Sequence, residues 1–501
     1  MSEYSNVEKP FLDKLEDLGW EVIDHGTSGI PQDPGISKRT SFRQDELKDV
    51  FKNVLSQINT IDDKPWLTEK QLDDLYDEIT ATELSSKSLL EANQDVFHKI
   101  VGLNKVSREN ENTHKSELVK FIDFENWDEN SFIAINQFRL DTPGGPRESI
   151  IPDIVLFVNG MPFVVIECKD VEVSDPISES VNQIMRYANT REDDFGIKEG
   201  EEKLFHYNLF SIATHGEEAR FGTITGDFEY YLNWKDIYPT EHKTFDITKY
   251  SNEEENRYKN NGLNKEPRVR QEVVIHGMLN KEILLDVLRH FTLFKETDEG
   301  FKIKLVCRYQ QYRAVGKMFD RLRTGKTAEE RSGVVWHTQG SGKSLTMIFF
   351  VRKLRSQPDL RDYKVIMMVD RHDLEKQLSK DAYLTNEFKK EYIVGSRNEL
   401  HSKLQGDASN LNMVMIHKLY ENELKHSKAL LKAFVEEKEV PEFKPFDVVN
   451  KSERIVILID EIQRSQGGEL GDNLFIGFPN AAKIGFTGTP IELVDRNTLA
   501  V

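Results

Sequence analysis

Apolar and polar residues are arranged in two different ways along the chain, and the change falls near residues 250–267. Before this segment, stretches with helical apolar spacing come first and short apolar runs follow. The helical spacing predicts helices over residues 11–18, 43–58 and 68–79. The apolar runs predict strands over residues 132–138, 153–158 and 163–168. We therefore expect an α/β domain in the first half of the chain.

The segment 250–267 is polar, charged and nearly free of large aliphatic side chains, which indicates a junction between domains. Residues 282–294 then regain helical apolar spacing, and short β-rich runs alternate with helices beyond them. These runs are Val334–Trp336, Val365–Val369, Met413–Ile416, Ile455–Ile459 and Ile484–Phe486. Such alternation predicts a parallel sheet with helices on both faces. We expect one domain over residues 1–260 and a second over residues 261–501.

Composition narrows the class of protein. No apolar run is long enough to span a bilayer, and the polar, acidic start lacks the layout of a secretory signal. Two cysteines, Cys168 and Cys307, exclude a disulfide framework and a four-cysteine zinc site. We expect a cytoplasmic protein with no membrane part. The net charge of −19 opposes free-standing, non-specific DNA binding, so DNA contact would need basic patches, bound metal or a partner subunit.

The first candidate site is a hairpin over residues 151–169, in which Asn159-Gly160 gives a strong turn signal. Asp153 opens the first strand, and Glu167 ends the second. A two-residue turn would pair Asp153 with Ile166 and place the two carboxylates on opposite faces. A three-residue turn, or a bulge with glycine in the left-handed region, would pair Asp153 with Glu167. We expect one of these last two arrangements, since both bring the carboxylates together.

Paired carboxylates in this position predict a site for a hard cation such as Mg²⁺. Asp153 and Glu167 would bind the metal, and the backbone carbonyl of Cys168 is a further candidate ligand. The metal would polarise a phosphodiester and activate a water. Lys169 would orient that water or neutralise developing charge.

This hairpin resembles the PD-(D/E)xK nuclease family, with Asp153, Glu167 and Lys169 at its three hallmark positions. Downstream, Gln183 and Tyr187 are spaced to share one helical face and resemble the Gln-x-x-x-Tyr motif of the RecB-like branch of that family. Glu8 is similar to an extra acidic residue that this branch carries in its first helix. The resemblance implies that Gln183 and Tyr187 belong to the catalytic centre.

The second candidate site is a glycine-rich loop between a predicted strand and a predicted helix. Backbone N–H groups of such a loop cradle phosphates at a helix N-terminus. The predicted nucleotide-binding residues are Thr338, Gln339, Gly340, Ser341, Gly342, Lys343 and Ser344. Lys343 would reach the outer phosphates of ATP, and Ser344 would bind Mg²⁺. His337 replaces the first glycine of the general pattern, as happens in superfamily 2 helicases.

Further short motifs follow in helicase order. Asp460 and Glu461 end an apolar strand; Asp460 would hold Mg²⁺ and Glu461 would activate the hydrolytic water. Gln311 lies in a segment that resembles the adenine-reading Q-motif, with Gln310 the less favoured alternative. Residues 487–490, Gly-Thr-Pro among them, resemble the motif that couples hydrolysis to DNA movement, and residues 370–377 and 416–418 resemble motifs that contact DNA.

Together these segments resemble the R subunit of type I restriction–modification enzymes, over nearly the whole chain. The resemblance implies a PD-(D/E)xK nuclease domain of RecB-like fold, followed by a RecA-like P-loop domain. It implies a bacterial or archaeal enzyme that uses ATP to translocate double-stranded DNA and Mg²⁺ to cleave it. It also implies methyltransferase (M) and specificity (S) subunits as partners. Gln463 departs from the pattern, because many relatives have His there.

A second RecA-like lobe with arginine fingers does not follow before Val501. We therefore expect this chain to be a fragment that binds ATP weakly and cannot translocate alone. Two other interpretations stay open: a helicase-nuclease of repair or another defence system without M and S subunits, and a non-enzymatic scaffold that binds nucleotide and proteins.

Overall fold

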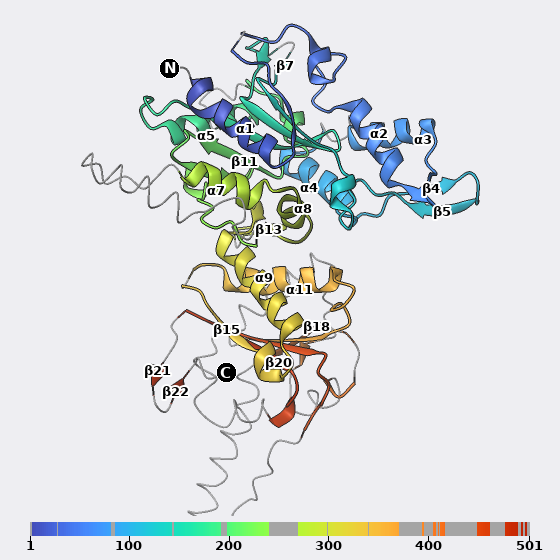
Figure 1. The fold of residues 1–501 in the computed structure, drawn as a ribbon, viewed down its shortest axis with the longest axis vertical. Coiled ribbons are helices and arrows are strands. Elements are labelled where there is room, and N and C mark those ends of the chain that lie inside the picture. The colour runs from blue at the N-terminus through green and yellow to red at the C-terminus, as the bar shows by residue number, and fades with distance from the viewer. Residues whose placement is uncertain are drawn as a thin grey trace, which may run out of the picture. The chain divides into compact units, whose positions relative to one another are not determined.

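The computed structural model divides the chain into two compact units, Met1–Tyr309 and Gln310–Val501, which are described separately (Figure 1). In the first unit it describes residues 3–239 and 269–309, except 28, 82–85, 143–144, 192–197 and 298. In the second it describes residues 310–369 except 339, and, further on, residues 393–394, 404–406, 409, 411–415, 448–460, 476–488, 492–493 and 496–497.

A six-stranded mixed sheet forms the centre of the first unit, in the order β1-β6-β9-β10-β11-β12. Its strands are β1 (Glu21–Ile23), β6 (Phe132–Asn136), β9 (Ile154–Val158), β10 (Met161–Cys168), β11 (Phe210–Thr214) and β12 (Ala219–Gly222). β1 is parallel to β6 and β10 is parallel to β11, whereas the other neighbours are antiparallel. The predicted strands 132–138, 153–158 and 163–168 are thus confirmed as β6, β9 and β10.

Helices surround this sheet. The predicted helices 11–18 and 68–79 are confirmed as α1 and α3, whereas the helix predicted over 43–58 begins five residues later, at Lys48, as α2. The α-helices that the structure describes in this unit are α1 (Lys9–Asp17), α2 (Lys48–Ile58), α3 (Glu69–Ile79), α4 (Leu89–Ile100), α5 (Pro176–Tyr187), α7 (Val269–Met278) and α8 (Lys281–His290), with a π-helical turn η1 (Tyr4–Glu8) ahead of α1. Two-stranded hairpins complete it: β2 (Thr60–Ile61) with β3 (Lys64–Pro65), β4 (Ser107–Asn110) with β5 (Lys115–Leu118), β7 (Leu140–Asp141) with β8 (Ser149–Ile150), and β13 (Thr292–Glu296) with β14 (Lys302–Val306).

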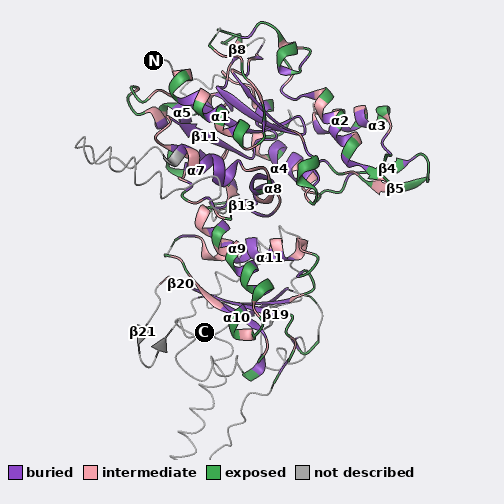
Figure 2. Ribbon diagram, viewed as in Figure 1, coloured by how far each residue is buried: buried purple, intermediate pink, exposed green. Residues whose placement is uncertain are grey.

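The core of the first unit lies on both faces of the sheet. Every residue of β6, β9 and β10 is buried, as Figure 2 shows for the central strands. α5 covers one face, where Ile177, Val181 and Ile184 join a cluster with Val155 and Val165. Strands that are buried on both faces have continuous apolar sequences. For this reason the three central strands could be predicted from the apolar runs of the sequence.

The unit boundary lies after Tyr309 and not near residue 260, where the composition changes. α7 and α8 follow the polar segment but pack on the first unit. Gln271 on α7 lies within 2.8 Å of the Thr214 hydroxyl, and the Trp20 indole N–H donates to the Leu279 carbonyl (3.0 Å). The apolar faces of these helices are buried there. A break in composition therefore marks a connection within the unit and not its end.

The register of the β9–β10 hairpin combines a two-residue turn with a β-bulge. Asn159 and Gly160 both have positive φ, 50° and 78°, and Met161 pairs with Val158. The register then shifts between Pro162 and Val164, so that Ile166 pairs with Ile154. The three-residue turn is wrong. The alternative, a bulge with the glycine in the left-handed region, is confirmed, although the bulge lies at Phe163 and not next to Gly160. By this register the bulge brings Glu167 opposite Asp153, as expected.

The hairpin turn is buried under the start of α2, which restricts position 160. The Gly160 carbonyl accepts the Leu47 N–H (2.8 Å), and a Cβ at Gly160 would lie 2.5 Å from the Leu47 carbonyl oxygen. Gly160→Ala would therefore combine left-handed strain with overpacking, and we expect it to destabilise the first unit by about 2–5 kcal/mol. Urea unfolding followed by tryptophan fluorescence measures this loss.

Gly102→Ala is the matched control, since Gly102 has φ +74° and a Cβ added there would meet no atom within 4 Å. Gly102→Ala should lower the free energy of unfolding by the left-handed strain alone, about 1–2 kcal/mol. Equal losses for the two variants would contradict the close approach of α2 to the turn.

The second unit is built on a parallel sheet with the order β15-β20-β19-β16-β18-β17. Figure 1 labels β15, β18 and β20 of this sheet. Its strands are β15 (Gly333–Trp336), β16 (Lys364–Val369), β17 (Ile393–Val394), β18 (Leu411–Met415), β19 (Ile455–Ile459) and β20 (Ala482–Thr487). All pairs are parallel. The helices described here are α9 (Tyr309–Thr324), α10 (Ala328–Arg331) and α11 (Lys343–Ser356), and a small pair joins β21 (Glu492–Leu493) to β22 (Arg496–Asn497).

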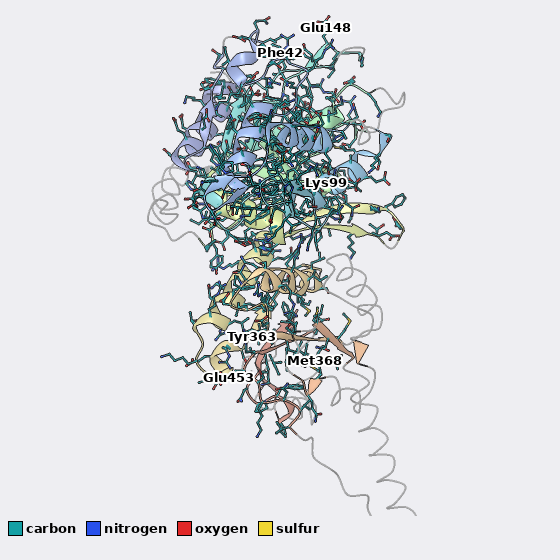
Figure 3. The ribbon with its side chains drawn as sticks, turned by 90° about the vertical axis from the view of Figure 1, so that its right-hand side faces the viewer. Phe42, Lys99, Glu148, Tyr363, Met368 and Glu453 are labelled. Carbon is teal, nitrogen blue, oxygen red and sulfur yellow. The ribbon has the colours of Figure 1, made fainter. Side chains whose placement is uncertain are left out.

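The five strands predicted for this unit are confirmed as β15, β16, β18, β19 and β20. Their side chains are drawn in Figure 3, where Met368 marks β16 in the middle of the sheet. β19 and β20 are buried along their whole length. Because the strands are parallel, the carboxyl ends of β15, β20 and β19 lie at one edge, where ligands bind in open α/β sheets.

Candidate functional site

Two carboxylates meet at one end of the β9–β10 hairpin. Asp153 directly precedes β9 and Glu167 lies near the end of β10, on the face that carries Val155 and Val165. The Cys168 N–H donates to Asp153 Oδ2 at 2.7 Å, which ties the two strand ends together. Both side chains are buried, with Glu167 fully enclosed. The bulge therefore gathers these carboxylates away from bulk water.

Lys169 supplies a positive charge beside them. Its ammonium donates to Glu167 Oε1 at 2.7 Å and to the Cys168 carbonyl at 2.8 Å. The Cys168 carbonyl therefore points toward the charged groups, as expected for a candidate ligand. The Cys168 thiol is buried, and burial raises its pKa well above the usual range, so the thiol stays protonated.

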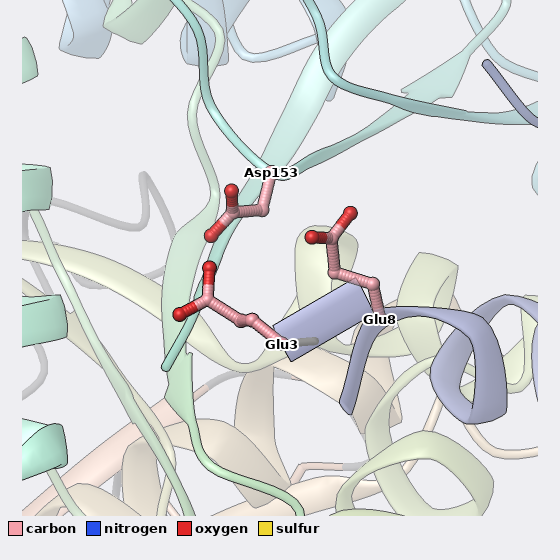
Figure 4. Close-up of side chains that lie close together, drawn as sticks. All are labelled: Glu3, Glu8 and Asp153. Atoms are coloured by element: carbon pink, nitrogen blue, oxygen red, sulfur yellow. The ribbon is translucent and has the colours of Figure 1, made fainter. Parts of the chain in front are cut away.

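Two further carboxylates approach Asp153 from the N-terminal segment (Figure 4). One carboxylate oxygen each of Glu3, Glu8 and Asp153 lies within 4.8 Å of the others. Glu8 is buried and accepts a hydrogen bond from Gln137 Nε2 (3.1 Å), whereas Glu3 is half-buried. The position of Glu8 agrees with its expected place near the hallmark residues. Sequence reasoning missed Glu3.

The reason Glu3 was missed is a local departure from α-helical geometry. Glu3 and Glu8 are five positions apart, which in an α-helix places side chains about 140° apart around the axis. The turn η1 is π-helical, and the Lys9 N–H donates to the Tyr4 carbonyl, five residues back. This wider turn brings both carboxylates to the same place, and helical periodicity gives no signal for it.

The electrostatics of the group oppose full ionisation without a cation. Burial, aided by Asp153, raises the pKa of Glu8 to about 7. Burial raises the pKa of Asp153 to about 6, although Lys169 and the Cys168 N–H act in the other direction. Burial and the charge of Asp153 hold the pKa of Glu167 well above its usual range. Burial lowers the pKa of Lys169, but Glu167 and Asp153 outweigh it and raise that pKa.

These residues fit a hard divalent cation. The donors are carboxylate and carbonyl oxygens, which Mg²⁺ prefers, and oxygens bound at about 2.1 Å from one ion lie about 3–4 Å apart. Glu167 Oε2 is buried and accepts no hydrogen bond from any described residue. Such a buried, unpaired carboxylate oxygen is costly, and a bound cation would satisfy it.

We expect the stabilisation by Mg²⁺ to grow with pH. Because the pKa values of Glu8 and Asp153 are raised to about 7 and about 6, the metal-free folded chain binds more protons than the unfolded chain below about pH 7. The stability from these protonated groups is lost as pH rises through their folded pKa values, while binding of a cation requires their ionised forms.

Thermal unfolding with and without Mg²⁺ measures this effect. The rise in melting temperature should be larger near about pH 8 than near about pH 5.5. The chain with Asp153→Asn is the control, since it should show little metal-dependent rise at either pH. A rise that does not change with pH would contradict binding at these carboxylates.

Gln183 and Tyr187 lie on α5 and contact each other. Gln183 Nε2 donates to the Tyr187 hydroxyl (2.6 Å), which donates to the carbonyl of Ile151 (3.1 Å). Tyr187 is buried, and its pKa is raised well above the usual range by burial and by Glu167 and Asp153. The pair therefore contacts the backbone two residues before Asp153, and its predicted place in the catalytic centre stays a prediction.

The glycine-rich loop of the second unit joins β15 to α11. Gly340 and Gly342 have φ of 78° and 80°, and α11 begins directly after Gly342. The Ser341 N–H and hydroxyl both donate to the Thr338 carbonyl (3.2 and 2.6 Å). The free N–H groups at the start of a helix and its dipole make such a loop an anion site. Lys343 and Ser344 open the helix, as expected, whereas Gln339 lies outside the described residues.

Gln311 lies against this loop. Its side-chain Nε2 donates to the Gly342 carbonyl (3.0 Å) and the Ser341 carbonyl (3.4 Å), and it would lie 2.5 Å from a Cβ at position 342. The glycine is therefore required where Gln311 approaches. Gln311 supports the loop by these contacts, and its predicted role as an adenine reader stays a prediction.

Of the other predicted motor residues, Asp460 and Thr487 lie at the same edge of the sheet, at the ends of β19 and β20. Asp460 directly follows β19, is buried, and its N–H bonds the Met368 carbonyl (2.9 Å). The His337 N–H donates to the Thr487 carbonyl (3.0 Å), which ties the loop to the end of β20. Glu461, Gln463, Thr489 and Pro490, together with residues 370–377 and 416–418, lie outside the described residues.

Two protein families match this chain, one in each of the two units. Residues 1–230 match the family described as the N terminus of the type I restriction enzyme R protein, and residues 310–501 match the SWI2/SNF2 ATPase family. A DNA-bound SWI2/SNF2 ATPase core from Sulfolobus solfataricus is 18% identical, covering 41% of this chain and 36% of that one, with a TM-score of 0.24. Within the described ranges, every helix is too short or too polar to span a bilayer.

Two curated relatives match almost the whole chain. The HindI endonuclease subunit of a type I restriction enzyme from Haemophilus influenzae is 29% identical over 99% of this chain and 43% of its own length. A putative MjaIXP endonuclease subunit from Methanocaldococcus jannaschii is 27% identical over the same shares. The chain thus spans less than half the length of these relatives. The resemblance drawn from the motifs is confirmed: the chain is similar along nearly all its length to endonuclease subunits of type I restriction enzymes, with an R-protein N-terminal region followed by a SWI2/SNF2 ATPase region.

Proposed function

We propose that the chain is the nuclease and first motor portion of a type I restriction enzyme R subunit. The observation that carries the nuclease half is the gathering of Asp153, Glu167 and Lys169 at the end of the β9–β10 hairpin, with Glu8 beside Asp153. A mixed sheet with buried central strands and α5 against it supports a PD-(D/E)xK domain of RecB-like fold.

In this proposal Asp153, Glu167 and the Cys168 carbonyl hold Mg²⁺, with Glu8 beside them. The bound metal would polarise the phosphodiester and lower the pKa of a water. Lys169 orients the attacking water or neutralises charge that develops on the phosphate, since its ammonium already lies 2.7 Å from Glu167. Gln183 donates to the Tyr187 hydroxyl, which donates to the Ile151 carbonyl, and these hydrogen bonds fix the backbone that leads into β9 and Asp153.

The second unit would bind and hydrolyse ATP to move double-stranded DNA. Its all-parallel sheet and loop-to-helix anion site support a RecA-like domain. Residues 338–344 would hold the phosphates, with Lys343 on the outer ones. Ser344 and Asp460 would hold Mg²⁺, Glu461 would activate the hydrolytic water, and Gln311 would contact the adenine or brace the loop.

M and S subunits are the proposed partners, and the S subunit would read the DNA sequence. The net charge of −19 supports this division, because stable engagement of DNA would come from the assembly.

The test uses the full-length R subunit with its M and S partners and circular plasmid DNA. We expect linearisation that requires both ATP and Mg²⁺ and that occurs away from the recognition sequence. Cleavage by the R subunit without M and S would instead support an independent helicase-nuclease. Absence of any ATP hydrolysis and any cleavage in the complete assembly would leave the scaffold interpretation.

A further inference from the structure

We propose that Glu3 is an additional metal-binding carboxylate of the nuclease centre, brought there by the π-helical turn η1. The proposal rests on the proposed nuclease function and deepens it, because it makes the first residues of the chain part of the metal site. Figure 4 shows the side chains of Glu3, Glu8 and Asp153 close together. One carboxylate oxygen of Glu3 lies within 4.8 Å of oxygens of both Glu8 and Asp153.

The N-terminal segment is fixed over the centre by contacts with the residue that follows Lys169. The Asp170 N–H donates to Glu3 Oε2 (3.2 Å), and Asn6 Nδ2 donates to Asp170 Oδ2 (3.0 Å). The Tyr4 hydroxyl also donates to Asp24 Oδ2 (2.7 Å). Glu3 is therefore held beside the site by the hydrogen bond to its own carboxylate and by the contacts of its neighbours Tyr4 and Asn6.

Charge balance points to a cation at this place. Glu3, Glu8, Asp153 and Glu167 act on one another, and Lys169 supplies one positive charge to the four carboxylates. Glu167 is fully buried beside Asp153, and its Oε2 accepts no hydrogen bond from any described residue. That unsatisfied oxygen is independent of Glu3, and it indicates that a positively charged ligand completes the group.

The π-helical turn has a structural role in this proposal. A continuous α-helix would direct Glu3 and Glu8 to different sides, whereas the wider turn directs both to Asp153. π-Helical turns cost stability and occur often at functional sites. The turn here places one more oxygen ligand at the cation, directly or through a bound water.

The experiment measures Mn²⁺ affinity of the 501-residue chain by isothermal titration calorimetry, with no DNA present. Glu3→Gln keeps an oxygen for the Asp170 N–H and removes the charge, while Glu3→Ala removes both. We expect both variants to bind Mn²⁺ about 10-fold more weakly, as for other groups that support a metal site. Glu16→Gln, on the exposed side of α1, is the matched control and should bind like the native chain.

The outcomes separate this proposal from the proposed function. If the native chain binds Mn²⁺ and Asp153→Asn abolishes binding, but Glu3→Gln binds as tightly as the native chain, the metal role of Glu3 is wrong. If Glu3→Ala weakens Mn²⁺ binding but Glu3→Gln does not, Glu3 acts only by accepting the Asp170 N–H, and its role as a metal ligand is wrong. If the native chain binds no divalent cation, the nuclease proposal itself fails. Equal melting temperatures of native and Glu3→Gln chains in metal-free buffer would show that an affinity loss is not due to unfolding.

Discussion

Asp153→Asn in the full-length subunit, assembled with its partners, is expected to lower DNA cleavage by about 10³-fold or more, because a metal ligand contributes several kcal/mol to the transition state. ATP hydrolysis should stay within about twofold, since the two candidate sites lie in separate units. Plasmid linearisation and phosphate release, measured on the same preparation, test both expectations.

The substitution is chosen to keep the fold. An asparagine oxygen can still accept the Cys168 N–H that Asp153 binds at 2.7 Å, and the neutral amide avoids the cost of a buried charge. We therefore expect the metal-free variant to melt at the native temperature or slightly above it. Asp13→Asn, at an exposed position on α1 paired with Lys9, is the control and should cleave normally. Loss of ATP hydrolysis together with cleavage would contradict the assignment of the two activities to two units.

How far the sequence predicts the nuclease site is clearest at the hairpin. We predicted that Asp153 faces Glu167 because two carboxylates are needed to bind one metal ion, and the structure places them so. The backbone differs from the expected three-residue turn, because Asn159 and Gly160 form a two-residue turn and the extra residue of the bulge is Phe163. Pro162 is the signal that could have located the bulge, since proline interrupts the ladder and is found at bulges.

Other features of the first unit depend on tertiary packing. Glu3 joins the carboxylates through a π-helical turn, and such a turn leaves no trace in apolar periodicity. The spacing of Gln183 and Tyr187 predicted a shared helical face, which their hydrogen bond confirms. Their contact with the Ile151 carbonyl could not be predicted, because it joins segments that are distant in sequence. The packing of α7 and α8 on the first unit could not be predicted for the same reason.

The second unit was more predictable because parallel sheets impose strong local patterns. Each strand is a short apolar run, and the candidate residues lie in the segments that follow strand ends at one edge. The sequence therefore placed Lys343 and Asp460 correctly relative to β15 and β19. It did not predict that Gln311 would donate to the Gly342 carbonyl, because the same glutamine pattern is consistent with reading an adenine.

Lys343→Ala is expected to lower ATP hydrolysis by the assembled full-length enzyme by about 10²-fold, since a charge-assisted hydrogen bond to phosphate is worth about 1.5–3 kcal/mol. Lys343 opens α11 directly after the left-handed Gly342, where the loop presents its N–H groups. Cleavage away from the recognition sequence should be lost as well, because the proposed function makes that cleavage depend on translocation. Phosphate release and a DNA-displacement assay measure the two effects.

Lys317→Ala is the matched control, because Lys317 is exposed on α9 in the same unit. It is the same change of side chain as Lys343→Ala and has the same effect on helix propensity. It should hydrolyse ATP at the native rate. Mn²⁺ binding by the nuclease centre should be unchanged in Lys343→Ala, because that site is built from the first unit alone. Retained translocation in Lys343→Ala would contradict the phosphate-binding role of the loop, whereas lost Mn²⁺ binding would mean that the two sites depend on each other. If each site is built within its own compact unit, Lys343→Ala should stop ATP hydrolysis while the metal site of the first unit still binds Mn²⁺.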